Sequence, residues 1–174
     1  MYVVGVCSLS PNADTSLLAY PSDNKEGILQ IFNCITLGPV CAIQAHRTTV
    51  TKVAFNIDGT LLATASDKGT ILRVFDTATG QKLHQFRRGT YPALIYYLSF
   101  NLQSTMLCVT SDSDTVHIFK VSPSSATASV AGQGAGIMSA LLPERIGGAL
   151  DSIRDFAHIK LPSSNTPSII ALSR

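Results

Sequence analysis

The sequence predicts an all-β fold built from a repeated unit of four antiparallel strands, and three observations support this prediction. Residues 56–66 align without a gap with residues 101–111, and a shorter copy at 12–20 lies about the same distance upstream. Apolar residues come in short β-rich runs that are separated by Asp-Gly, Lys-Gly and Thr-Gly turn signals. A period of about 44 residues is typical of propeller blades. The predicted fold is therefore a partial β-propeller of the WD-repeat type.

The second repeat shows the four expected strands most clearly. They are Val50–Phe55, Leu61–Ala65, Ile71–Phe75 and Leu83–Phe86. The third strand of each repeat ends in Ile-Phe or Val-Phe, where many WD repeats carry a Trp-Asp pair, and the chain contains no Trp.

We place the blades at residues 3–44, 48–88 and 94–161, and we expect residues 168–174 to begin a further blade. A closed propeller needs about four to eight blades, and three blades would leave apolar sheet faces open at both ends. Most WD propellers have seven blades, so we expect the chain to be a fragment or an incomplete gene model of a seven-bladed propeller.

The composition excludes several classes of function. An apolar content of 45% predicts a packed body, and a net charge of +2 gives no reason to expect nucleic acid as a partner. The four cysteines form no Cys-x-x-Cys pair, so we expect reduced thiols in a cytosolic protein and no metal. No secretory signal, 18-residue apolar run, phosphate loop or nucleophile elbow is present, so we predict a protein that is not an enzyme and has no cofactor.

Function is sought where the repeats differ. The residue two positions before the strand-ending Phe is Gln30 in the first repeat, Arg73 in the second and His117 in the third. The second repeat also holds seven of the 13 basic residues of the chain. Exposed strands and turns commonly carry Lys and Arg for solubility, so this concentration alone leaves an ordinary surface as an alternative.

The end of the outermost strand of the second repeat reads Phe86-Arg87-Arg88-Gly89. Successive side chains of a strand point to opposite faces, so Arg87 and Arg88 are expected to serve two different pockets. Arginine suits phosphate because its planar fork donates two parallel charged hydrogen bonds. We expect Gly89 to let the backbone turn away without a clashing Cβ.

The turns between the second and third strands supply small polar groups around each expected pocket. They are Thr64, Ser66, Lys68 and Thr70 in the second repeat, and Ser111 and Thr115 in the third. Hydroxyls and turn amides of this kind complete the binding of a phosphorylated ring.

These residues resemble the PROPPIN or WIPI family, and the resemblance runs almost from end to end. It is densest over residues 61–75, over 80–83 together with 86–89, and over 115–119. The resemblance implies a seven-bladed propeller, of which this chain is about blades four to six and the start of seven, and which acts in autophagosome formation. It implies binding to phosphatidylinositol 3-phosphate and 3,5-bisphosphate.

The resemblance also implies two headgroup sites beside Gly89. The first consists of His46, Thr64, Ser66, Thr70, Arg73 and Arg87, and the second of Arg88, Ser111, Thr115 and His117. The implied partners are the lipid-transfer and conjugation machinery of autophagy. The implied location is the cytosol, with peripheral attachment to preautophagosomal, endosomal or vacuolar and lysosomal membranes.

The period breaks at residues 122–155 before a strand resumes at Phe156–Leu161. We predict a long loop here, and its second half carries apolar residues at helical spacing. The residues expected to enter a membrane are Ile137, Met138, Leu141, Leu142, Ile146, Leu150 and Ile153. This interpretation resembles the membrane-inserting loop of the family, and a helix packed on the propeller wall is the alternative. A WD-repeat scaffold that binds only proteins is the alternative for the whole chain.

Overall fold

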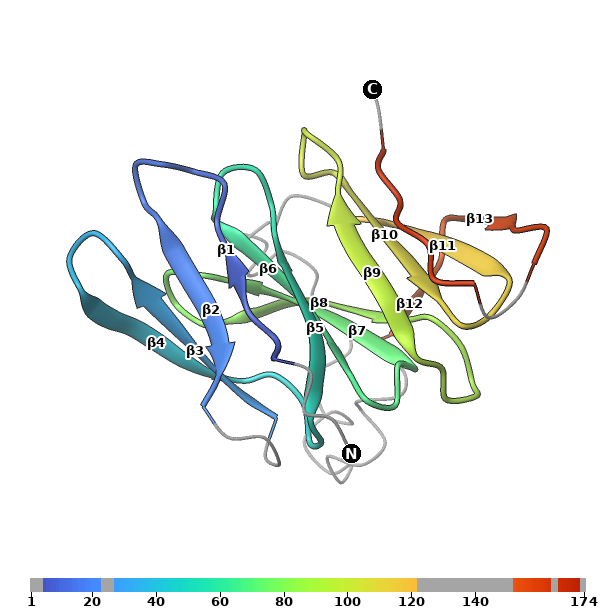
Figure 1. Ribbon diagram of the computed structural model, residues 1–174, viewed down its shortest axis with the longest axis horizontal. Helices are drawn as coiled ribbons and strands as arrows, with labels where there is room; N and C mark the ends of the chain where they lie inside the picture. Colours follow the sequence, from blue (N-terminus) through green and yellow to red (C-terminus); the bar gives the residue numbers. More distant parts are fainter. Residues whose placement is uncertain (1–4, 23–26, 122–151, 164–165, 173–174) are drawn as a thin grey trace, which may run out of the picture.

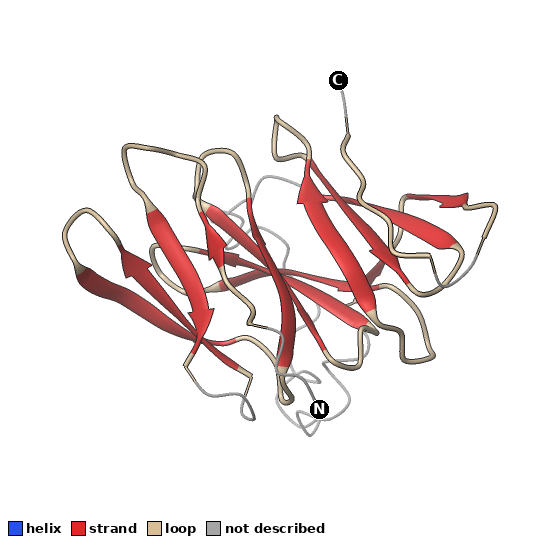
Figure 2. Cartoon of the chain, viewed as in Figure 1, coloured by secondary structure: helices blue, strands red, loops and turns tan. Residues whose placement is uncertain are grey.

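A computed structural model describes residues 5–22, 27–121, 152–163 and 166–172 of the chain. These residues form strands and loops and no helix (Figure 2), which confirms the all-β prediction. The same residues contain no helix long and apolar enough to cross a membrane. The strands form three sheets that follow one another along the chain (Figure 1).

The first sheet contains four antiparallel strands in chain order. They are β1 (Ser8–Leu9), β2 (Leu17–Pro21), β3 (Ile28–Asn33) and β4 (Gly38–Gln44). Pro39 lies on β4, the outer strand, where a missing N–H interrupts no central ladder.

The second sheet contains β5 (Val50–Phe55), β6 (Leu61–Ser66), β7 (Ile71–Asp76) and β8 (Lys82–Arg87) in antiparallel order. Each strand agrees with its predicted bounds to within one residue. A fifth strand, β12 (Ile153–Arg154), pairs parallel to β8 at the outer edge, and the sequence did not predict this pairing.

The third sheet contains β9 (Ile95–Phe100), β10 (Met106–Ser111) and β11 (Thr115–Lys120). Its outer strand is β13 (Ala157–Lys160), which pairs antiparallel with β11. The strand expected to resume after the insertion is therefore confirmed.

The helical spacing predicted for the end of the insertion is wrong at Ile153. This residue lies in a strand, because its backbone pairs with the edge strand β8. Ile137 to Leu150, which carry the rest of that prediction, lie outside the described residues.

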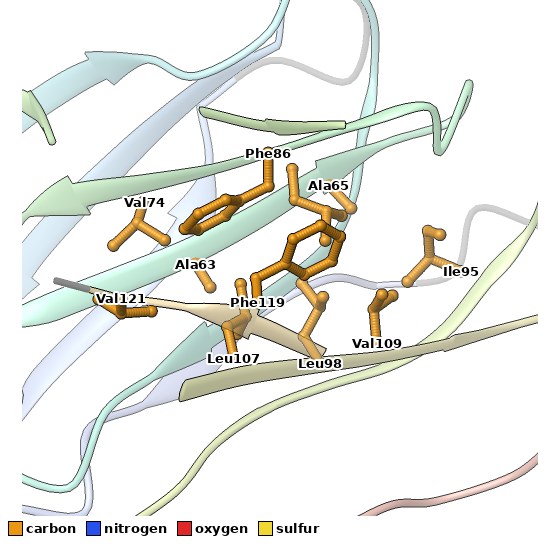
Figure 3. Close-up of a cluster of buried hydrophobic side chains, with 11 residues drawn as sticks. Ala63, Ala65, Val74, Phe86, Ile95, Leu98, Leu107, Val109, Phe119 and Val121 are labelled. Atoms are coloured by element: carbon orange, nitrogen blue, oxygen red, sulfur yellow. The ribbon is translucent and has the colours of Figure 1, made fainter. Parts of the chain in front are cut away.

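Two apolar cores hold the three sheets together. One lies between the first and second sheets and includes Leu29, Ile31 and Leu62. The other lies between the second and third sheets, where Figure 3 shows the rings of Phe86 and Phe119 against each other. Their centroids are 4.9 Å apart, and both side chains are fully buried.

The first strands of the three sheets lie side by side, since β5 contacts both β1 and β9. This arrangement and the face-to-face packing of the sheets are those of propeller blades. Residues 166–172 form no strand, and the Ser168 carbonyl accepts a hydrogen bond of 2.8 Å from the Thr110 hydroxyl. Their role in a further blade stays a prediction.

Candidate functional site

The first group of predicted residues lies on one face of the second sheet. Thr64 is the register partner of Arg73, Arg73 of Gln85, and Ile71 of Arg87. Directly paired residues on neighbouring strands point to the same face. The sheet therefore brings Thr64, Arg73 and Arg87 to the same side, together with Gln85, which the sequence did not single out.

His46 is tied to this face by a buried network. Its Nε2 lies 2.9 Å from the Thr64 hydroxyl, and its Nδ1 lies 3.4 Å from Nη1 of Arg73. The Thr64 hydroxyl donates in turn to the Arg73 carbonyl at 3.4 Å. These contacts fit a neutral imidazole that carries its proton on Nε2 and accepts from Arg73 at Nδ1.

The electrostatics agree with a neutral His46. Burial, followed by the adjacent Arg73 guanidinium, lowers the pKa of His46 to about 4. His46 is 4% exposed and Thr64 is fully buried. Both residues therefore position Arg73 rather than offer a surface to a ligand.

Arg73 is held at three of its five N–H groups. Its Nη1 donates to the Ala45 carbonyl at 2.6 Å and faces His46, and its Nε donates to Oε1 of Gln85 at 2.9 Å. Burial, and then the nearby Arg47, lowers the pKa of the Arg73 guanidinium. The two N–H groups on Nη2 make no hydrogen bond within the described residues, so Arg73 presents an oriented donor pair.

Ser66, Thr70 and Arg87 lie at the end of this face, next to the β6–β7 turn. The Ser66 carbonyl accepts from the Gly69 N–H at 2.9 Å, and the Thr70 carbonyl accepts from the Arg88 N–H at 2.9 Å. Arg87 is half-buried, and its side chain forms no ion pair or hydrogen bond with any described residue. Its charge is therefore available to a ligand.

Arg88 follows Arg87 and points to the opposite side, towards the third sheet. Its Nε donates to the Gly69 carbonyl at 2.7 Å, and its Nη2 donates to the Tyr91 carbonyl at 2.6 Å. Burial lowers the pKa of the Arg88 guanidinium, and the nearby Asp112 carboxylate opposes this effect. Arg88 thus fastens the chain after β8 in addition to any contact with a ligand.

The second group of predicted residues lies on β10 and β11. The Ser111 hydroxyl is 2.8 Å from the Ser113 hydroxyl, and Thr115 donates to Asp114 at 3.0 Å. His117 pairs in register with Val109, which packs in the core against the second sheet, so the imidazole faces the side of Arg88. None of these side chains is hydrogen-bonded to Arg88 within the described residues.

His117 instead contacts a carboxylate that the sequence analysis missed. Asp155 Oδ2 lies 3.0 Å from Nδ1 of His117 and 3.4 Å from Nδ1 of His158. Asp155 comes directly after β12, so the end of the insertion is attached to the second group. No motif marks this contact, because Asp155 is 38 positions from His117 in the sequence.

The steric reason expected for Gly89 is wrong. A Cβ built on Gly89 would meet no atom within 4 Å, and its backbone does not lie in the left-handed region. The glycine that is required lies in the β6–β7 turn: Gly69 has a φ of +60°, and a Cβ there would lie 2.0 Å from the Ala93 carbonyl oxygen.

Two cavities differ in the charge of the residues that line them. A cavity of about 340 Å³ lies between β4 and β7–β8 and is lined by Arg73 and Lys82. A cavity of about 320 Å³ between the inner strands β5 and β9 has no charged lining residue. The charged lining favours anion binding at the cavity between β4 and β7–β8 over the cavity between β5 and β9.

The remaining chemistry of the described residues is limited. All four cysteines are free, and burial raises the pKa of the Cys108 thiol to about 11, which makes it a poor nucleophile. Across residues 5–22, 27–121, 152–163 and 166–172, no group of three or more His, Cys, Asp or Glu residues is arranged to hold a metal ion.

Comparison with known proteins gives a consistent result. The PROPPIN family model matches residues 2–174. Autophagy-related protein 18 of Dictyostelium discoideum is 41% identical over 186 aligned residues, covering 97% of this chain and 50% of that protein. Autophagy-related protein 18 of Mycosarcoma maydis is 46% identical over 139 residues, covering 68% of this chain and 31% of that protein.

Solved structures show the same fold. Kluyveromyces lactis Hsv2 with its complete loop 6CD has a TM-score of 0.70 at 26% identity, covering 91% of this chain and 46% of that one. A complex of KlAtg21 with the coiled coil of AgAtg16 gives a TM-score of 0.62 at 32% identity, covering 68% of this chain and 40% of that one. The chain spans half or less of the length of these relatives.

Proposed function

The chain belongs to the PROPPIN family, and from this we propose that it is a phosphoinositide-binding protein that is recruited to membranes in autophagosome formation. The ligands would be phosphatidylinositol 3-phosphate and 3,5-bisphosphate. The observation that carries the proposal is the position of Arg87 and Arg88, which extend from the end of β8 towards two different polar groups. The mechanism is binding and recruitment, with no chemical step.

In the first site, the headgroup phosphate would bind between Arg73 and Arg87. Arg73 offers two oriented N–H groups, and Arg87 offers an uncompensated guanidinium on the same face of the sheet. Ser66 and Thr70 add hydroxyl and turn donors at the end of that face. His46 and Thr64 would contribute indirectly, because their buried hydrogen-bond network holds the Arg73 side chain in place.

In the second site, Arg88, Ser111, Thr115 and His117 would surround a second headgroup. Arg88 and His117 lie on the facing sides of the second and third sheets, which supports a shared pocket. Asp155 already lies on Nδ1 of His117, so a phosphate would bind Nε2 or displace the carboxylate.

The two sites would act together on a bilayer. Once one headgroup is bound, binding of the second is intramolecular and raises the overall affinity without a new contact. Insertion of the loop would add apolar burial. The residues proposed for insertion are Ile137, Met138, Leu141, Leu142, Ile146 and Leu150, while Ile153 is paired to β8 at the base of the loop.

The proposed partners follow from the same family. A structural relative is recorded with the coiled coil of Atg16, which supports a partner from the conjugation machinery. Lipid-transfer machinery is proposed on family grounds. The proposed location is the cytosol, with peripheral attachment to preautophagosomal, endosomal or vacuolar and lysosomal membranes.

The test is binding of the purified full-length protein to vesicles that carry phosphatidylinositol 3-phosphate. We expect Arg87→Thr and His117→Ala each to weaken binding by about tenfold, and the double variant to abolish it. These two substitutions are preferred because neither side chain fastens a turn as Arg88 does. Circular dichroism checks that each variant is folded.

Failure of the wild type to bind these vesicles would leave the protein-only scaffold as the better explanation. Binding that is unchanged in the double variant would reject the two sites. Equal binding to vesicles with phosphatidylserine at the same total charge would reject specific recognition of the headgroup.

A further inference from the structure

The segment that returns from the insertion, residues 152–155, runs along the rim of the first site. Ile153 and Arg154 form β12, in which Arg154 is the register partner of Arg87. The Ser152 hydroxyl accepts a hydrogen bond of 3.1 Å from Nε2 of Gln85. Gln85 also accepts from Arg73, so the returning segment is linked through one side chain to the first site.

The hydrogen bond to Gln85 fixes the orientation of this segment. Because Ser152 reaches Gln85, it lies on the face of the second sheet that carries Arg73 and Arg87. Arg154 lies on this face as well, because it is the register partner of Arg87 and directly paired residues on neighbouring strands point to the same face.

Three guanidinium groups are thus collected on one face: those of Arg73, Arg87 and Arg154. Within the described residues, none of them forms an ion pair with a carboxylate. Like charges directly opposite each other on neighbouring strands, about 4.8 Å apart, destabilise a sheet. An anion bound between Arg87 and Arg154 would remove this repulsion.

The one carboxylate next to Arg154 in sequence is engaged elsewhere. Asp155 points to the other side of the segment and contacts His117 and His158. Arg154 is exposed, and its side chain has no hydrogen-bond partner among the described residues. The returning segment therefore places the Arg154 guanidinium on the side of the first site and the Asp155 carboxylate on the side of the second.

We infer that Arg154 is a further ligand of the first headgroup site, and that it binds the same phosphorylated inositol ring as Arg87. The inference rests on the proposed function. It predicts an effect confined to the first site, because the neighbouring Asp155 and not Arg154 faces the second.

The experiment isolates each site in the full-length protein. His117→Ala leaves the first site as the main binding site, and Arg87→Thr leaves the second. Arg154→Gln is added to each background, and dissociation constants are measured with vesicles of phosphatidylcholine containing phosphatidylinositol 3-phosphate. Lys120→Gln is the matched control, since it removes an equal charge from an exposed residue at the far end of β11.

Arg154→Gln is expected to weaken binding by about tenfold in the His117→Ala background and by less than about twofold in the Arg87→Thr background. Lys120→Gln is expected to change neither by more than about twofold. An equal loss in both backgrounds, or an equal loss after Lys120→Gln, would reduce Arg154 to a general surface charge and overturn the inference.

No loss in the His117→Ala background would also overturn the inference while leaving the proposed function intact. If the wild type does not bind, or if Arg87→Thr and His117→Ala are both without effect, the proposed function itself fails. Arg154 then has no headgroup site to join, and the inference fails with it.

Discussion

Replacing the two neighbouring arginines one at a time should affect folding very differently. Arg88 donates two short hydrogen bonds, to the Gly69 and Tyr91 carbonyls, from a side chain that is 9% exposed. Arg87 is half-buried and forms none with the described residues. Arg88→Thr therefore removes a clamp between the β6–β7 turn and the chain after β8, and Arg87→Thr removes only a charge.

The magnitude follows from the two lost bonds. Hydrogen bonds to a charged group contribute about 1.5 to 3 kcal/mol each, and water can replace part of this at the exposed Tyr91. We expect Arg88→Thr to lower the free energy of unfolding by about 2 to 3 kcal/mol. Arg87→Thr should change it by less than about 0.5 kcal/mol, as is usual for surface residues.

The assay is urea unfolding of the full-length protein at neutral pH, monitored by circular dichroism. The slopes of the transitions are compared first, because midpoints report stability only when the slopes are equal. Arg88→Lys is the control, because an ammonium group keeps the charge but cannot reach both carbonyls with a planar fork. We expect it to fall between wild type and Arg88→Thr. Equal midpoints for Arg87→Thr and Arg88→Thr would refute the structural role of Arg88.

Three further predictions concern single positions. The pKa of His46 lies below the value of about 6.5 for the unfolded chain, so the unfolded state takes up the proton first and stability should fall by about 2 kcal/mol between pH 7 and pH 5. Urea unfolding at both pH values checks this, and His46→Gln should remove that part of the dependence. Gly69→Ala should unfold or strongly destabilise the protein because its Cβ would overlap a carbonyl, whereas Gly89→Ala should shift the thermal midpoint little; equal shifts would contradict the geometry. Asp155→Asn should tighten vesicle binding by about threefold by removing a negative charge beside the proposed phosphate of His117, and weaker binding would argue against that position for the phosphate.

The sequence predicted most of the sheet architecture because the repeat supplies several copies of the same evidence. The strands of the second repeat agree with the structure to within one residue, since each is bounded by a turn signal. The error at Ile153 has a different origin. Its apolar spacing fits a helix, but the short segment contacts β8 and takes the strand conformation that this edge pairing requires.

The sequence predicted which of the candidate site residues share a face of a sheet, but not the hydrogen-bond networks that they form. Alternation along the strand after Phe86 correctly separates Arg87 from Arg88. It says nothing about their partners, and the carbonyl contacts of Arg88 depend on a turn about 19 positions away. The long-range contacts of Ser152 and Asp155 carry no local pattern at all, because a Ser or an Asp after a long insertion is an ordinary surface residue.

The returning segment, residues 152–155, contacts both sheets whose facing sides carry the proposed headgroup sites. Ser152 contacts Gln85 on the second sheet, and Asp155 contacts His117 on the third, so four residues bridge two neighbouring sheets at their outer edges. Each contact ends on a side chain that also borders a proposed headgroup site. We therefore expect a ligand that moves Arg73 or His117 to shift residues 152–155 as well, and we expect substitution of Gln85 or Asp155 to change headgroup binding.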